Sequence, residues 1–234
     1  MLFIHETHSV IGRCEDEFEE AFRGPDGYMA RLAKDGDARL LWYLDHVHGT
    51  GPAYTVVTVT AVRDASAWEK LSERVAGGDM REWVGALDRL RYDGVSKVLR
   101  PLPWSSLQQV DLADVPTEPA EHELALFMED TANPHQGRVH DYIELAGGQY
   151  APSLRRPNPL LDMVGAFQPA FGAGRRQEIV LWQRVADQQA LLRLLTTPVP
   201  AAMKAPGTWM HDALEVRDQW TSRLLRTSSW SPLQ

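Results

Sequence analysis

The chain has 234 residues, of which 44% are hydrophobic and 24% are charged, a composition typical of a soluble globular protein. Its net charge is −8 and its basic residues are interspersed with acids, which argues against a nucleic-acid partner because phosphate binding requires clustered Lys and Arg. The single cysteine, Cys14, excludes an intrachain disulfide and favours a reducing compartment, and residues 1–12 resemble neither a signal peptide nor a membrane span, so we expect a cytoplasmic protein without membrane contact.

The first half of the chain predicts the element order β-α-β-β-α-β. Apolar residues are concentrated in β-rich runs for the strands and recur at helical spacing for the helices. The expected elements are a strand at 2–8, a helix over 15–34 that breaks at Gly24-Pro25, strands at 40–47 and 54–62, helices at 64–75 and 80–90, and a strand at 95–99. This order is that of a ferredoxin-like unit, whose antiparallel strands normally lie in the order 4-1-3-2.

The end of this first unit recurs at the end of the chain. Residues 99–108 match residues 225–234 at six of ten positions. The same offset of 126 pairs Trp83 with Trp209, Arg91 with Arg217 and Ser96 with Ser222, and offsets of 123 or 122 pair Asp64 with Asp187, Glu6 with Glu129 and Tyr28 with Tyr150. We therefore expect a duplicated domain, whose two halves we call copy one and copy two.

Copy two predicts the same elements as copy one. They are strands at 124–129, 161–167, 178–185 and 222–225, and helices at 138–146, 188–195 and 209–220. We expect copy one at 1–108, an acidic linker with two prolines at 109–122, and copy two at 123–234. Because helices cover only one face of each sheet, we expect the other faces to pack sheet to sheet as a pseudo-dimeric α+β barrel with a ligand pocket.

Both copies end with a strand, a bend and the pattern Trp-Ser-x-Leu, at residues 104–107 and 230–233. These tails resemble those of the NIPSNAP family, within the wider group of dimeric α+β barrels that includes antibiotic-biosynthesis monooxygenases, with Trp where the family usually has Phe. The first strand departs from the family pattern, since Glu6 and His8 stand where Arg and Tyr are usual. The resemblance therefore implies the fold rather than a particular reaction.

Glu6 and His8 are the first candidates for catalysis. They lie two apart on a predicted strand and so point to the same face. If that face lines an apolar pocket, burial raises the pKa of the carboxyl and makes either group a general acid or base. Glu129 takes the place of Glu6 in copy two and is the third candidate. The alternative is a solvated strand end, or an ion pair with an arginine such as Arg100.

His46 and His48 also lie two apart on a predicted strand, which is the spacing at which two imidazoles can bind one metal ion. A third ligand is missing, because in the order 4-1-3-2 His8 lies roughly two strand spacings, about 9.6 Å, from that strand. We therefore expect no metal and consider the pair for substrate contacts, or else as polar residues beside a turn.

Trp42, Phe127 and Trp182 lie in predicted strands, where they form either an apolar pocket wall that contacts substrate or the layer between sheet and helices. Trp83 and Trp209 lie on corresponding predicted helices at core spacing, and we expect both to serve packing.

Together these features predict a small-molecule enzyme of secondary or catabolic metabolism. We expect an isomerase, cyclase, lyase or monooxygenase without a cofactor, acting by proton transfer on an apolar or aromatic metabolite. The sequence has no Gly-rich phosphate loop and no Gly-x-Ser-x-Gly elbow, so nucleotide and acyl-enzyme chemistry are not expected. A non-catalytic carrier or sensor of an apolar ligand is the alternative, and haem binding through His140 or His211 is a weaker one. Assembly as a homodimer is compatible with these features.

Overall fold

A computed structural model describes residues 1–155, 157 and 159–234, and it has a mixed α+β fold with antiparallel strands, which confirms the predicted fold class. The chain divides into two compact units. Unit 1 contains Met1–Arg100, Gln109–Ala125 and Leu224–Gln234, and unit 2 contains Pro101–Gln108 and Leu126–Arg223. How the two sheets pack against each other stays a prediction.

Unit 1 contains most of copy one. Its elements are β1 (Leu2–Val10), η1 (Gly12–Cys14), α1 (Glu15–Arg23), α2 (Tyr28–Ala33), β2 (Ala38–His46), β3 (Thr55–Val62), α3 (Ala65–Ala76), α4 (Arg81–Leu87) and β4 (Arg91–Pro101). The helix predicted over 15–34 does break after Gly24, which ends α1. Asp64 caps the N-terminus of α3, because its carboxylate accepts a hydrogen bond of 2.9 Å from the Ala67 amide.

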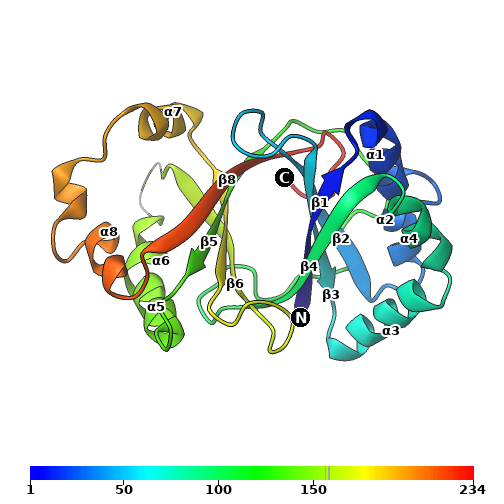
Figure 1. Cartoon of the computed structure of the whole chain (residues 1–234), viewed down its shortest axis with the longest axis horizontal. Coiled ribbons are helices and arrows are strands. Elements are labelled where there is room, and N and C mark those ends of the chain that lie inside the picture. The colour runs from blue at the N-terminus through cyan, green and yellow to red at the C-terminus, as the bar shows by residue number, and fades with distance from the viewer. Residues whose placement is uncertain (156, 158) are drawn as a thin grey trace. The chain divides into compact units, whose positions relative to one another are not determined.

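The strands of unit 1 lie in the order β4-β1-β3-β2, which is the predicted order 4-1-3-2. Figure 1 shows α1 to α4 on one side of these strands. The core between sheet and helices is apolar and strongly aromatic, because Phe18 and Phe22 of α1 pack with Tyr28 of α2 and Tyr43 of β2. Side chains on even-numbered positions of β1, including Glu6 and His8, face this core, as the contacts of His8 with Phe18 and Phe22 show.

Unit 2 contains most of copy two. Its elements are β5 (Leu126–Asn133), α5 (Val139–Leu145), the π-helical turn η2 (Ala146–Tyr150), α6 (Ala151–Ser153), β6 (Leu161–Pro169), β7 (Ile179–Val185), α7 (Gln188–Thr196), η3 (Ala201–Lys204), α8 (Trp209–Asp212), η4 (Ala213–Glu215) and the first part of β8 (Gln219–Thr227). The strand order is β8-β5-β7-β6, so unit 2 repeats the arrangement of unit 1. Asp187 caps α7 through the Ala190 amide, just as its counterpart Asp64 caps α3.

The tail of each copy packs in the unit built mainly by the other copy. Trp230 of copy two belongs to the unit 1 core, where its ring lies 5.0 Å from that of Tyr43 and its indole donates a 2.7 Å hydrogen bond to Glu19. Residues 225–227 at the end of β8 extend the unit 1 sheet beside β2. In unit 2, the indole of Trp104 from copy one donates a 2.8 Å hydrogen bond to the carbonyl of Ile143, and Leu102 joins the core. The two tails are therefore exchanged.

The predicted boundaries were wrong at the last strand of each copy. The helix predicted over 209–220 ends at Glu215, because the helical spacing of apolar residues holds only through Val216 and the chain is extended from Gln219. In copy one, β4 begins at Arg91 rather than at 95. The first parts of both strands are mostly exposed, from Tyr92 in β4 and from Gln219 in β8, so they lack the apolar alternation by which a strand is recognised.

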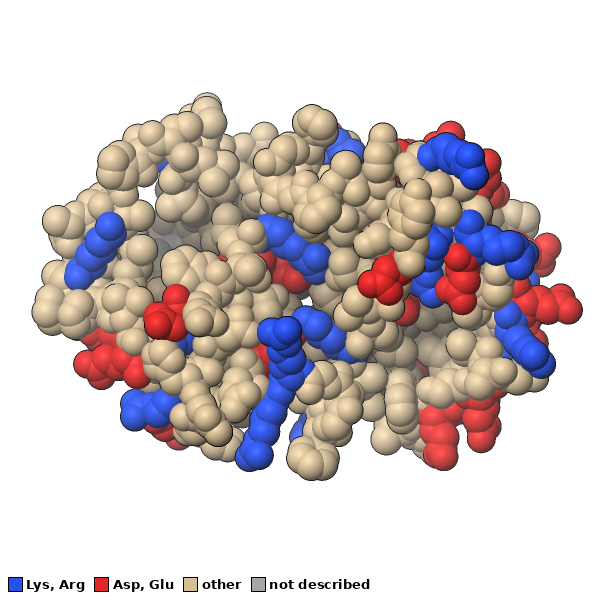
Figure 2. Space-filling model, viewed as in Figure 1, with Lys and Arg blue, Asp and Glu red and all other residues tan. Residues whose placement is uncertain are grey.

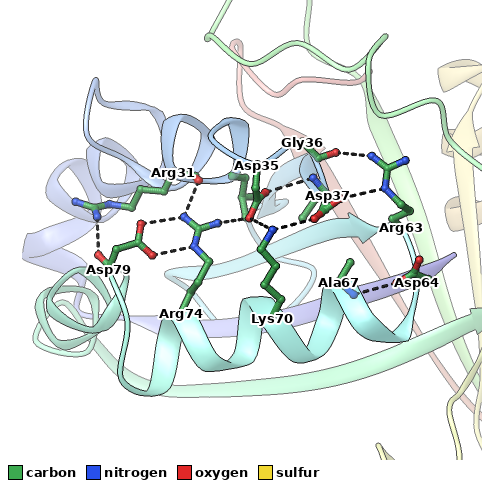
Figure 3. Close-up of polar contacts among 12 residues, drawn as sticks. Arg31, Asp35, Gly36, Asp37, Arg63, Asp64, Ala67, Lys70, Arg74 and Asp79 are labelled. Atoms are coloured by element: carbon green, nitrogen blue, oxygen red, sulfur yellow. Dashed lines mark hydrogen bonds and ion pairs between the residues drawn. The ribbon is translucent and has the colours of Figure 1, made fainter.

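Exposed ion pairs join α3 to the segment before β2 (Figure 3). Arg74 donates to both carboxylate oxygens of Asp79 at 2.8 and 3.0 Å and to Asp35 at 3.0 Å, and Lys70 donates to Asp37 at 3.1 Å. These partners lower the pKa of the Asp37 and Asp79 carboxyls. The cluster is solvated and fastens one helix to one loop, which is a structural role.

Basic and acidic side chains are intermingled on the face shown in Figure 2. Among the described residues, no helix combines the length and the apolar character needed to cross a membrane.

Candidate functional site

A buried polar cluster surrounds Glu6 and His8 between the unit 1 sheet and its helices. His8 is fully buried, with its ring 5.2 Å from Phe18 and 5.8 Å from Phe22. Its Nδ1 lies 2.7 Å from a guanidinium nitrogen of Arg91, and its Nε2 lies 3.1 Å from the Thr58 hydroxyl. Arg91, rather than the Arg100 considered from the sequence, is thus the arginine beside this pair.

The contacts of His8 fix its protonation. Arginine carries only donors, so Nδ1 of His8 must accept from Arg91 and the ring proton must lie on Nε2, from which it is donated to Thr58. Burial, together with the nearby positive charge of Arg91, lowers the pKa of His8 to about 3. His8 is therefore a neutral imidazole with both nitrogens engaged, and its contacts position Arg91.

Glu6 has the opposite shift. Burial raises the pKa of its carboxyl, and the charge of Arg91 opposes that effect only in part. Arg91 is held from the other side by Asp88, to which it donates at 3.0 Å through Nε. A carboxyl whose pKa is raised in this way is a stronger base once ionised than an ordinary glutamate.

Small residues of the last strand lie next to Glu6 and His8. The residues of β4 that pair with β1 at this point are Ser96, opposite Glu6, and Gly94, opposite His8. Both are exposed, and Glu6 remains partly accessible although its neighbour His8 is not. Beside Glu6 and His8, β4 therefore carries only a small side chain and a glycine.

An aromatic pair forms the far wall of the cluster. Tyr28 stacks on Trp83 with ring centroids 5.0 Å apart and an angle of 13° between the planes. The Tyr28 hydroxyl accepts a 3.3 Å hydrogen bond from Thr60, and burial and the nearby Glu6 raise its pKa. Trp83 itself donates a 2.8 Å hydrogen bond to the carbonyl of Ala21, which fixes the ring.

Unit 2 contains an equivalent cluster around Asp130. Tyr150 stacks on Trp209 with centroids 5.1 Å apart and an interplanar angle of 23°, as Tyr28 does on Trp83. The Tyr150 hydroxyl donates to Gln183 Oε1, and Gln183 Nε2 donates to Asp130 at 3.1 Å. Burial raises the pKa of Asp130, while hydrogen bonds from Ser222 and Gln183 lower it in part. Four pairs of identical residues in the repeat are therefore found in both clusters. They are Tyr28 with Tyr150, Trp83 with Trp209, Arg91 with Arg217 and Ser96 with Ser222.

The structural partner of Glu6 in copy two is Asp130. Asp130 pairs across the sheet with Leu181, which belongs to the core under the helices, whereas Glu129 pairs with Trp182 on the opposite face. On that face Glu129 forms an ion pair with Arg223, whose guanidinium approaches it to 2.8 Å. The offset of 123 that paired Glu6 with Glu129 is therefore one residue short at this strand.

The other sequence candidates lie away from both clusters. Phe127 and Trp182 contact each other at 5.7 Å on the face that carries Glu129, and Trp42 lies on the corresponding face of unit 1, one position before the helix-facing Tyr43. His46 lies at the end of β2 and His48 is exposed in the following turn. In the part of the chain that the structure describes, no group of three or more His, Cys, Asp or Glu side chains is placed to hold a metal ion. His140 is exposed and His211 is bonded to Asp212.

Sequence reasoning missed Arg91, Asp130 and the two tyrosines as members of a site. The repeat contained a signal for these residues, since Arg91 and Tyr28 each have an identical counterpart in copy two. Polar and exposed positions of duplicated domains are otherwise free to diverge. Recurrence of polar residues between copies was a better guide than the acid and imidazole on a single strand.

Two solved structures that match nearly the whole chain have a similar fold. Neither a protein-family model nor a curated protein matches the sequence. A "putative monooxygenase" from Lactobacillus acidophilus matches with a TM-score of 0.61 and 9% identity over 99% of this chain and 97% of its own. An anthrone oxidase-like protein matches with a TM-score of 0.59 and 9% identity over 97% of this chain and 91% of its own.

A NIPSNAP domain protein from Burkholderia xenovorans matches 44% of this chain and 97% of its own, with 20% identity and a TM-score of 0.37. Membership of the NIPSNAP family stays a prediction.

Proposed function

We propose that this chain is a small-molecule enzyme that moves a proton at Glu6 on an apolar, aromatic substrate. The observation that carries the proposal is a carboxyl of raised pKa that is partly accessible beside exposed Gly94 and Ser96 while the rest of its surroundings are buried. Strongly perturbed ionisable groups with a specific charged partner are typical of active sites. The name of the anthrone oxidase-like protein is compatible with an aromatic substrate, and the name of the Lactobacillus protein is compatible with an oxygenation.

In this proposal each residue has a separate role. Glu6, as the carboxylate, removes a proton from an activated carbon of the substrate. Arg91 stabilises the negative charge that develops there, and His8 and Thr58 position Arg91 through the hydrogen bonds described above. Tyr28 and Trp83 offer an aromatic surface for the substrate ring. Substrate contacts by Trp42, Phe127, Trp182, His46 and His48, and acid or base chemistry at Glu129, stay predictions for a separate site, since none of these residues lies beside Glu6.

The carbanion has two fates that need no cofactor. Return of the proton to another carbon gives an isomerisation. Reaction with dioxygen gives an oxygenation, in which a carbon–oxygen bond forms, the peroxide takes the proton from Glu6, and loss of water leaves a carbonyl. The second path converts one CH2 group and one O2 into one C=O group and one H2O.

The test uses anthrone as the probe, since its CH2 group is acidic and lies in a planar polycycle. Exchange of the CH2 protons in heavy water reports proton transfer, and oxygen uptake reports oxygenation. We expect Glu6→Gln to lower the exchange rate about 10²- to 10⁴-fold, the usual contribution of a general base. Glu73→Gln, at an exposed position of α3, is the matched control and should retain the wild-type rate.

Equal exchange rates for Glu6→Gln and the wild type would exclude Glu6 as the base. Binding of anthrone without any enzyme-dependent exchange or oxygen uptake would instead favour the non-catalytic carrier. A visible absorption band in the purified protein would favour the haem alternative over both.

A further inference from the structure

Two of the buried polar atoms of unit 2 that have no hydrogen-bond partner belong to Arg217 and Asp130. They are Nε of Arg217 and Oδ1 of Asp130. Arg217 is more than nine-tenths buried, with 8% of its surface exposed. Leaving a buried polar atom without a partner destabilises the folded state, and more so when the group is charged, so these two atoms require an explanation.

Aromatic rings surround the guanidinium. Its central carbon lies 4.4 Å from the ring of Trp220, 5.5 Å from that of Trp209 and 6.0 Å from that of Tyr142. Trp220 is half exposed and covers the arginine from the solvent side. A planar molecule that enters beside Trp220 therefore meets apolar ring surface together with a cationic donor.

A π-helical turn builds one side of the cluster. The η2 turn runs from Ala146 to Tyr150 and ends on the tyrosine that stacks on Trp209 and bonds to Gln183. Such turns interrupt the regular backbone pattern of a helix and occur frequently at functional sites. In unit 1 the corresponding connection is the break between α1 and α2, so the turn is specific to copy two.

The two clusters differ in how the arginine is used. In unit 1 Arg91 donates to His8 and to Asp88. Counting from the Glu6 and Asp130 pair, the place of His8 is taken in unit 2 by Ala132, and the place of Thr58 by Leu181. The Nε of Arg91 is engaged by Asp88, but at the offset of 126 that pairs Arg91 with Arg217 the place of Asp88 is taken by Leu214. With no carboxylate at that place, Arg217 Nε remains unpartnered, and the charge of Arg217 acts on the Asp130 carboxyl, which also has an unpartnered oxygen.

We propose that unit 2 holds a second ligand site, which binds a hydroxylated aromatic molecule without transforming it. One hydroxyl of the ligand accepts from Arg217 Nε and donates to Asp130 Oδ1, because a phenolic hydroxyl can do both at once. The ligand ring lies against the aromatic side chains around Arg217. This site goes beyond the proposed function of Glu6 and does not depend on it.

The test is titration of the full chain with 2-naphthol and, as the matched probe, naphthalene, which has the same rings without the hydroxyl. Indole N–H resonances of Trp209 and Trp220 report binding in unit 2, and that of Trp83 reports binding in unit 1. We expect 2-naphthol to shift the two unit 2 signals with a Kd at least tenfold lower than that of naphthalene, since each hydrogen bond to a charged group contributes about 1.5–3 kcal/mol.

Two variants locate the contact. Arg217→Lys keeps the charge and removes the Nε donor, and Arg217→Gln removes both, so each should raise the Kd for 2-naphthol at least tenfold. Arg91→Lys in unit 1 is the matched control and should leave the Trp220 titration within about twofold of wild type. Glu6→Gln should do the same, which separates this site from the proposed catalytic one.

The proposal is overturned if 2-naphthol and naphthalene titrate the unit 2 signals equally, or if the affinity for 2-naphthol survives in Arg217→Lys. It is also overturned if neither probe shifts the unit 2 signals, and a water molecule bridging Arg217 and Asp130 in a crystal structure would then account for both atoms. Should Arg217→Gln fail to fold, the lysine variant and the two probes still decide the question.

Discussion

Replacing Trp230 should destabilise the N-terminal unit although the residue lies four positions from the C-terminus. The side chain is 1% exposed, packs on Tyr43 at 5.0 Å and donates a 2.7 Å hydrogen bond to Glu19. Truncation of a fully buried tryptophan to alanine costs about 3–5 kcal/mol in lost burial and cavity formation. We therefore expect Trp230→Ala to lower the free energy of unfolding of unit 1 by about 3–5 kcal/mol.

A second substitution divides this loss into its parts. Trp230→Phe keeps an aromatic ring in the core but removes the indole donor, and the carboxylate of Glu19 stays partly solvated, so we expect a loss of about 1–2 kcal/mol. Trp68→Ala on α3, where the ring is 39% exposed, is the control and should change stability by about 1 kcal/mol or less.

Urea unfolding followed by circular dichroism measures these differences, and hydrogen exchange assigns them to a unit. The Tyr43 amide donates to the Ser231 hydroxyl at 3.1 Å, so its exchange reports whether the tail is docked. We expect Trp230→Ala to speed exchange at Tyr43 while amides of β7 in unit 2 change little. A loss below about 1 kcal/mol, or equal acceleration in both units, would refute the inference that the tail is part of the unit 1 core.

Two further predictions concern pH. The pKa of His8 is lowered from 6.5 to about 3, so between these pH values the unfolded state binds a proton that the folded state does not. The contribution of His8 to stability is therefore fully present above pH 6.5, and the unfolding free energy falls by up to about 1.4 kcal/mol per pH unit down to pH 3. His8→Gln should flatten this loss, which urea titrations at pH 7 and pH 4.5 measure. Burial raises the pKa of Asp45 to about 6, so its favourable contribution is present below about pH 4 and is lost as pH rises through 6. Asp45→Asn should therefore raise the unfolding free energy by about 1–3 kcal/mol at pH 8 relative to its effect at pH 4, and an equal effect at the two pH values would contradict the assignment.

The order of elements could be predicted because local patterns determine it. Strand β3 is a run of β-branched residues, and α3 has an aspartate cap followed by apolar residues at helical spacing. The start of β4 could not be predicted in this way, because Tyr92 to Ser96 are exposed and carry no apolar alternation. A strand whose first half borders solvent leaves little trace in the sequence.

The candidate site could be predicted only in part. Glu6 and His8 were found because they share one strand face, but that face is covered by helices and the imidazole has both nitrogens engaged. Asp130 was missed because a shift of one residue in the alignment of the copies moves a side chain to the other face of the sheet. Alignment offsets vary from 122 to 126 along the chain, so a one-residue uncertainty was unavoidable without the hydrogen-bond register.

Nor could the sequence show where the tails pack. Both tails carry Trp-Ser-x-Leu, so each fits a docking site in either unit, and no local pattern distinguishes docking in its own unit from exchange. The choice depends on the path of β4 and β8, which is a property of the folded chain.

The exchanged tail determines the order in which the two units complete their folding during synthesis. Protein chains grow from the N-terminus, so β2 is made long before its partner segment, and the bond between Tyr43 and Ser231 joins residues 188 positions apart. Until residues 225–233 have emerged, the nascent unit 1 has an unpaired strand edge at β2 and lacks the tryptophan that completes its core. Contacts this distant in sequence form slowly, so the N-terminal half is translated first but is completed last.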